Sequence, residues 1–168
     1  MKISIYQALI PVAIRQLENL SNILNKASAH AVAKKIDESV FINARLFPDM
    51  LPLSRQVQIA CDAAKAGAAR LAEIEIPSHL DSETTFAQLQ ERIQKTIAFL
   101  QTITPAQIDD KEDLKISYVQ RNKENNFIGL PYLQNWVLPN LFFHITTTYA
   151  ILRHNGVEIG KKDYLGSL

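Results

Sequence analysis

The chain has 168 residues, of which 47% are hydrophobic and 21% are charged, and its formal net charge is +1. This balance indicates one globular domain over residues 1–168 and excludes a disordered chain. No basic stripe interleaved with aromatic residues is present, so we expect no nucleic-acid partner. The absence of a long apolar run and of a signal-peptide pattern predicts a cytoplasmic protein that does not cross a membrane.

The first long helix is predicted over residues 4–26, where apolar residues recur at steps of three and four. Pro11 lies inside this segment, and because proline removes a backbone donor we expect a kink or a later start near it. Residues 28–35 are predicted to form a separate short helix. Residues 37–51 are expected to be irregular, and a connection of this length is often functional.

The second long helix is predicted over residues 53–74, which are rich in alanine. Its small side chains, and Gly67 among them, favour the close approach of a neighbouring helix. The third long helix is predicted over residues 82–103, with Ser82 as its N-cap and a continuous apolar stripe.

Residues 109–135 are expected to be irregular, apart from a small β-hairpin that pairs residues 115–119 with 127–130. The fourth long helix is predicted over residues 136–154 and ends before Gly156. Because this helix is apolar nearly all round, we expect it to be buried. The fold class is therefore all-α, a four-helix bundle in which ligands are usually held between facing helices.

The fourth helix carries a polar row in which Asn140, His144 and Thr148 are four residues apart and so share one face. An imidazole inside a bundle can serve as a metal ligand or a general base. The alternative is a histidine that is hydrogen-bonded to a polar neighbour, with no further role.

The second helix carries a polar stripe formed by Gln58, Asp62 and Lys65. This stripe either faces His144 or is a solvated surface, since charged residues are rarely fully buried unless they are paired. The single cysteine, Cys61, borders the stripe. Its position in the middle of a helix predicts a buried and unreactive thiol.

The loop that leads into the second helix contains Arg45 and Asp49. An arginine fork suits a carboxylate or a phosphate, so Arg45 is a candidate anion ligand at the mouth of a pocket. The alternative is a salt bridge between Arg45 and Asp49 that fixes the loop.

Residues 144–153 (HITTTYAILR), with Gly156, resemble the last helix of DinB/YfiT-like proteins. Three stretches, 45–50 (RLFPDM), 56–65 (QVQIACDAAK) and 152–161 (beginning LRHNG), resemble more closely one uncharacterised branch of that superfamily. The resemblance covers essentially the whole chain. It implies a four-helix bundle and often a homodimer. Many members of the superfamily hold zinc or nickel with three histidines, and some are thiol-dependent transferases or hydrolases.

The match to that metal site is partial. His144 corresponds to the last of the three histidines, Asn140 occupies the position of the second, and the second helix of this chain contains no histidine. Gln58 or Asp62 would have to replace the missing ligand.

We therefore interpret the chain as a DinB-like protein that binds a small ligand in a polar pocket between the second and fourth long helices. The candidate pocket residues are His144, Asn140, Gln58, Asp62, Arg45 and Asp49. One alternative is a metal-dependent, thiol-using transferase or hydrolase with His144 as a metal ligand. Another is a structural homodimer without activity.

Overall fold

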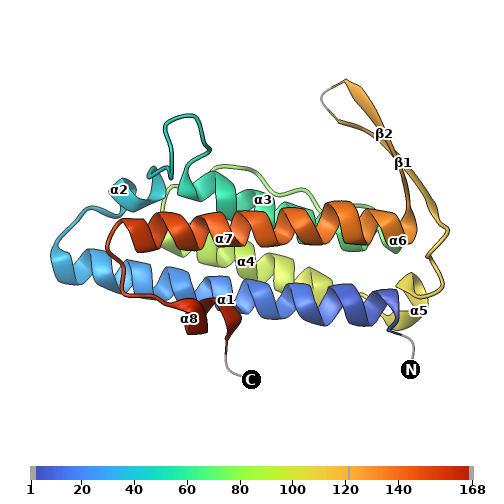
Figure 1. Cartoon of the computed structure of the whole chain (residues 1–168), viewed down its shortest axis with the longest axis horizontal. Helices are drawn as coiled ribbons and strands as arrows, with labels where there is room; N and C mark the ends of the chain where they lie inside the picture. The colour runs from blue at the N-terminus through green and yellow to red at the C-terminus, as the bar shows by residue number, and fades with distance from the viewer. Residues whose placement is uncertain (1–2, 121, 167–168) are drawn as a thin grey trace.

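Four long helices lie side by side in the computed structural model, which describes residues 3–120 and 122–166 (Figure 1). They are α1 (Ile5–Lys34), α3 (Leu53–Leu71), α4 (Phe86–Gln101) and α7 (Leu138–His154). The shorter elements are α2 (Glu38–Ile42), α5 (Pro105–Ile108), β1 (Lys115–Gln120), β2 (Lys123–Ile128), α6 (Gly129–Tyr132), the π-helix η1 (Leu133–Val137) and α8 (Lys161–Leu165). The predicted all-α bundle is confirmed. In the part of the chain that the structure describes, no helix is long and apolar enough to cross a membrane.

Helix α1 is longer than predicted. It begins with a capping box between Ser4 and Gln7 and runs past Pro11 without interruption, so the start lies before the proline. Pro11 and Gln7 are exposed, so water can solvate the carbonyl group that the proline cannot bond. The separate helix predicted over residues 28–35 is wrong, because the buried stripe of α1 continues through Ala27 and Ala31.

Helices α3 and α7 pack closely, as the small residues of α3 predicted. The contact is tightest at Gly67, where an added methyl group would collide with the side chain of Val137. A row of alanines on α3 is fully buried along the same helix: Ala60, Ala64 and Ala68. Small side chains thus bring the backbone of α3 close to η1 and α7.

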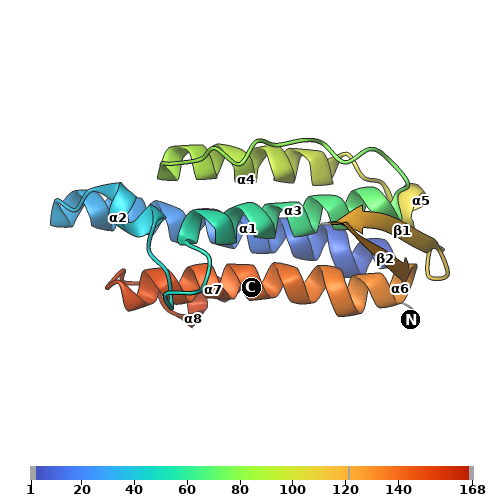
Figure 2. The same cartoon turned by 90° about the horizontal axis from the view of Figure 1, so that it is seen from above.

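Helix α4 begins four residues later than predicted. Thr85, not Ser82, is its N-cap, because Thr85 and Gln88 form a capping box with two hydrogen bonds of 3.2 Å. After a turn at residues 72–73, the chain up to residue 85 forms neither helix nor strand and runs back along the length of the bundle, as Figure 2 shows. We call residues 72–85 the strap.

The predicted β-hairpin is present, with β1 and β2 antiparallel and Lys115 opposite Ile128. Its turn is tighter than expected, because Lys123 already pairs with Gln120. The hairpin projects from the end of the bundle beside α6 (Figure 1).

The last helix is less buried than its composition predicted. Its segment begins as the π-helix η1, in which the N–H of Leu138 bonds to the carbonyl of Leu133, five residues back. Pro139, the next residue, has no N–H to continue a regular ladder. Trp136 is 39% exposed and Phe143 is 55% exposed, so an apolar face of this helix points outward. Gly156, at φ 87°, follows the end of α7 as predicted.

Candidate functional site

A half-open cavity of about 440 Å³ lies where α3, the strap, β1 and η1 converge. Helix α3 contributes the short or apolar side chains Ile59, Ala63 and Ala66 to its lining. Three aromatic residues, Tyr118, Tyr132 and Trp136, form another wall. A concave site of this size is typical of small-molecule binding sites, and in this one polar side chains share the lining with apolar ones.

Lys65 is the most deeply buried charged group of this lining, with a side chain that is 4% exposed. Its ammonium lies 3.0 Å from Asp62 Oδ1, which is its one protein partner among the described residues. An ammonium group has three N–H donors. Lys65 therefore has donors to spare at the wall of the cavity.

Arg70 lies at the other end of the same wall. Its Nη1 donates a hydrogen bond of 2.9 Å to the hydroxyl of Tyr132, and its guanidinium carbon lies 3.7 Å from the ring centre of Tyr118. Burial raises the pKa of Tyr132 despite the nearby Arg70, so the phenol stays protonated. No carboxylate of the described residues pairs with Arg70.

Two buried polar atoms of the cavity lining have no hydrogen-bond partner among the described residues. They are Nδ1 of His79 and the hydroxyl oxygen of Tyr118. Burial lowers the pKa of His79, and the charges of Lys65 and Arg92 lower it further. The imidazole is therefore neutral near pH 7. Buried polar groups are almost always paired, so these two atoms call for a water molecule or a ligand.

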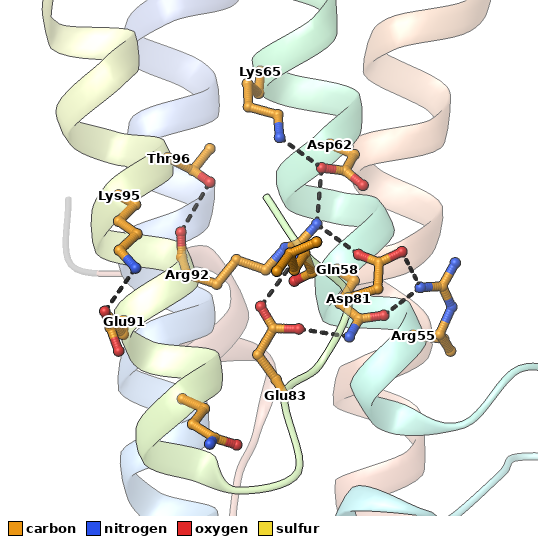
Figure 3. A network of polar contacts seen from close by, with 12 residues as sticks. Arg55, Gln58, Asp62, Lys65, Asp81, Glu83, Glu91, Arg92, Lys95 and Thr96 are labelled. Carbon is orange, nitrogen blue, oxygen red and sulfur yellow. Dashed lines mark hydrogen bonds and ion pairs between the residues drawn. The ribbon is translucent and has the colours of Figure 1, made fainter. Parts of the chain in front are cut away.

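Behind the cavity, Arg92 of α4 ties the strap to α3 (Figure 3). Its guanidinium, 1% exposed, lies 2.9 Å from Asp62 Oδ1, 3.0 Å from Asp81 Oδ1 and 2.9 Å from Glu83 Oε1. It also donates to the carbonyl of Leu80 at 3.1 Å. One buried arginine thus holds two carboxylates and a carbonyl of the strap against α3.

Gln58 belongs to this network and not to the cavity. Its Nε2 donates to Glu83 Oε2 at 2.7 Å, and its Oε1 accepts from Arg55, which also pairs with Asp81. Burial raises the pKa of Glu83 and Asp81, but their hydrogen bonds and ion pairs with arginine outweigh that effect, so both pKa values are lowered. All the carboxylates of the network are matched by cations, which indicates a structural role for it.

His144 forms a separate contact between α7 and α3. Its Nδ1 lies 2.7 Å from Oε1 of Gln56, whose Nε2 donates to the carbonyl of Leu51 at 3.0 Å. Because the amide nitrogen is engaged elsewhere, the amide oxygen accepts and Nδ1 of His144 carries the proton. Burial lowers the pKa of His144, so its other ring nitrogen is unprotonated near pH 7.

The sequence profile of the DUF1993 family, a domain of unknown function, matches residues 5–165. The chain belongs to the DUF1993 family. It is also similar to a solved structure described as a DinB family member protein from Shewanella denitrificans, at 44% identity and a TM-score of 0.91. That match covers 97% of this chain and 92% of the other. No curated protein matches. The expected DinB-like branch is thereby confirmed.

The three-histidine metal site of the superfamily does not fit the residues of this DUF1993 chain. Among the described residues, no three His, Cys, Asp or Glu side chains are grouped so that they could hold a metal ion. The partner of His144 is the amide of Gln56, and the amide of Asn140 donates to the carbonyl of Trp136 at 2.6 Å. Amides are poor zinc ligands.

The half-open cavity beside Lys65 is called the α3–α7 cavity below. Of the six residues predicted for the pocket, the DUF1993 structure places Asp62 and Asn140 in its lining. His144 follows Asn140 by one helical turn but is paired with Gln56, so neither Gln58 nor Asp62 lies opposite it as expected. Arg45 is exposed and donates to the carbonyl of Met50 at 2.5 Å. No ion pair joins Arg45 to Asp49 in the described chain, and neither residue lines the cavity.

Sequence reasoning missed most of the cavity wall: Arg70, His79, Tyr118, Tyr132 and Trp136. One available signal was spacing, since Arg70 follows Ala66 by four residues and Ala63 by seven, which places all three on one face of α3. A second was Pro139, which marks the irregular turn that carries Trp136.

Proposed function

We propose that this protein binds a small organic molecule in the cavity between α3 and η1–α7. The observation that carries the proposal is the side chain of Lys65, 4% exposed, with one protein partner and with donors left over at the cavity wall. A buried ammonium with unused donors is costly unless water or a ligand accepts from it.

The shape and chemistry of the lining support the same proposal. Ala63 and Ala66 leave room beside α3, while Trp136, 39% exposed, offers a flat apolar surface. The unpartnered hydroxyl of Tyr118 supplies a further polar contact. A cavity with both apolar and polar walls orients a ligand as well as binding it.

The chain provides its own reporter for a binding test, because Trp136 is its single tryptophan and lines the cavity. We expect benzoate, benzamide or benzylamine to change the Trp136 fluorescence and to show saturation transfer in ligand-observed NMR. Ala63→Leu adds a larger side chain inside the cavity and should weaken both signals, whereas Ala33→Leu, on the exposed face of α1, should retain them. If none of the three probes binds at millimolar concentration, the proposal is refuted.

We also propose that the chain forms a homodimer through the outer face of η1 and α7. Trp136 and Phe143 are seven residues apart, which places them on the same side of the helix, and they are 39% and 55% exposed. Analytical ultracentrifugation should show a dimer that Phe143→Ser dissociates. Val32→Ser, which changes a 76% exposed residue on α1, is the matched control.

A further inference from the structure

We infer that the ligand of the α3–α7 cavity is a small organic acid with one negative charge and a flat apolar body, such as an aromatic carboxylate. This inference rests on the proposed function, because it names the class of molecule that the cavity takes.

The charges around the cavity do not balance. Two basic side chains of the lining, Lys65 and Arg70, meet one carboxylate of the lining, Asp62. Asp62, the one carboxylate that lines the cavity, is shared by Lys65 at 3.0 Å and Arg92 at 2.9 Å. One positive charge is therefore left over, and a ligand with one negative charge would neutralise it.

The hydrogen-bond donors on the cavity wall also suit a carboxylate. Lys65 has unused N–H groups, Arg70 presents a guanidinium that no described carboxylate occupies, and the Tyr118 hydroxyl is unpartnered. Charge-assisted hydrogen bonds from such groups to a carboxylate are shorter and stronger than neutral ones. An amine would face the opposite situation, because Lys65 and Arg70 would repel it.

The aromatic wall determines the body of the ligand. Tyr118 and Tyr132 are linked through Phe127, whose ring centre lies 6.1 Å and 5.1 Å from theirs, and Trp136 lies 5.6 Å from Phe127. Phe127 thus holds three cavity-lining rings in place from behind. The exposed part of Trp136, held in place by Phe127, offers a flat ring a preformed stacking surface with little loss of conformational freedom.

The experiment compares three probes of nearly equal size, namely benzoate, benzamide and benzylamine, by Trp136 fluorescence and by NMR. We expect benzoate to bind at least about tenfold more tightly than benzamide, since a charged hydrogen bond commonly contributes that factor. Benzylamine should bind more weakly than benzamide, and raising the salt concentration should weaken benzoate alone. Benzamide binding as tightly as benzoate would overturn the inference while leaving the proposed function intact.

Two variants test whether Lys65 and Arg70 are the groups that bind the carboxylate of benzoate. Lys65→Met and Arg70→Met should each reduce benzoate affinity about tenfold or more and leave benzamide affinity nearly unchanged. Lys95→Met removes the same charge from an exposed pair with Glu91, outside the cavity, and should leave both affinities unchanged. In the Lys65→Met variant, Arg92 still pairs with the carboxylate of Asp62, so that carboxylate keeps a cationic partner. Equal benzoate affinity in all three variants would refute the assigned class.

Discussion

His144 and Gln56 join α7 to α3 through a contact of 2.7 Å between Nδ1 and Oε1. Gln56 is 2% exposed, and its amide nitrogen is held by the carbonyl of Leu51. The amide of Gln56 thus connects the loop before α3, the start of α3 and the middle of α7. This connection fixes both the tautomer and the orientation of the imidazole.

The first prediction concerns the titration of His144. Burial lowers its pKa, so NMR should show a midpoint below the usual value of about 6.5. In Gln56→Met the midpoint should fall further, because the amide oxygen stabilises the charged imidazolium more than the neutral ring. A midpoint at or above about 6.5 in the unchanged protein would contradict the burial argument.

The same titration has a consequence for stability. Between the folded pKa of His144 and about 6.5, the unfolded chain binds more protons than the folded one. The contribution of His144 to the free energy of unfolding should therefore be complete above about pH 6.5 and should decrease as the pH falls from there to the folded pKa. His144→Phe, which cannot titrate, should weaken that dependence in urea titrations at several pH values.

The second prediction concerns the strap. Arg92→Leu leaves the carboxylates of Asp62, Asp81 and Glu83 without their shared guanidinium, and breaking a buried pair in this way costs about 3–5 kcal/mol. Urea unfolding should show a loss of that size. Lys95→Leu removes one partner of an exposed pair and should change stability by no more than about 1 kcal/mol.

The destabilisation by Arg92→Leu should also depend on pH. The pKa values of Asp81 and Glu83 are lowered in the folded protein. Their contribution to the free energy of unfolding is therefore present above their pKa values in the unfolded chain, and it is lost as the pH falls through their pKa values in the folded protein. The difference in unfolding free energy between the two proteins should therefore narrow below about pH 4. A difference that stays constant down to pH 3 would show that the arginine acts only through packing.

The third prediction concerns Cys61, which is fully buried. Burial raises the pKa of its thiol to about 12, so almost no thiolate exists near pH 8. Thiol reagents should therefore leave the native protein unmodified and react fully in denaturant. Val32→Cys in a Cys61→Ala background places a thiol at a 76% exposed position and should react at once. Fast labelling of native Cys61 would indicate that α3 opens locally.

The long helices could be predicted because each carries a continuous apolar stripe. The stripe of α4, from Phe86 through Ile93 to Leu100, is buried as its spacing indicated. The first residue of a helix was harder to predict. Ser82 and Thr85 are both good N-caps, but only Thr85 has a Gln three residues later to complete a capping box. The tertiary packing of residues 27–31 of α1 likewise outweighed a local break that the composition suggested.

Spacing could indicate only the part of the cavity wall that lies on α3, because the rest of the wall comes from segments that are distant in sequence. Arg70, His79, Tyr118 and Trp136 meet only after the strap and the hairpin have folded onto α3. The register of Gln56 and Gln58 posed a related problem. Two residues along a helix turn a side chain by about 200°, so Gln56 reaches His144 while Gln58 reaches Glu83.

The last prediction concerns metal. Asn140 stands where the resemblance to the superfamily implies a histidine, and His144 pairs with the amide of Gln56. Both amides are engaged in hydrogen bonds within the chain. A lone imidazole binds zinc or nickel weakly, since stable sites need three or four nitrogen, sulfur or carboxylate ligands. Elemental analysis of untagged protein, purified without chelator, should therefore give zinc and nickel at background both in the unchanged chain and in His144→Ala. Near-stoichiometric metal that disappears in His144→Ala would show that the amides are displaced and would restore the metalloenzyme hypothesis. Metal retained in both proteins would place the ligands elsewhere in the chain.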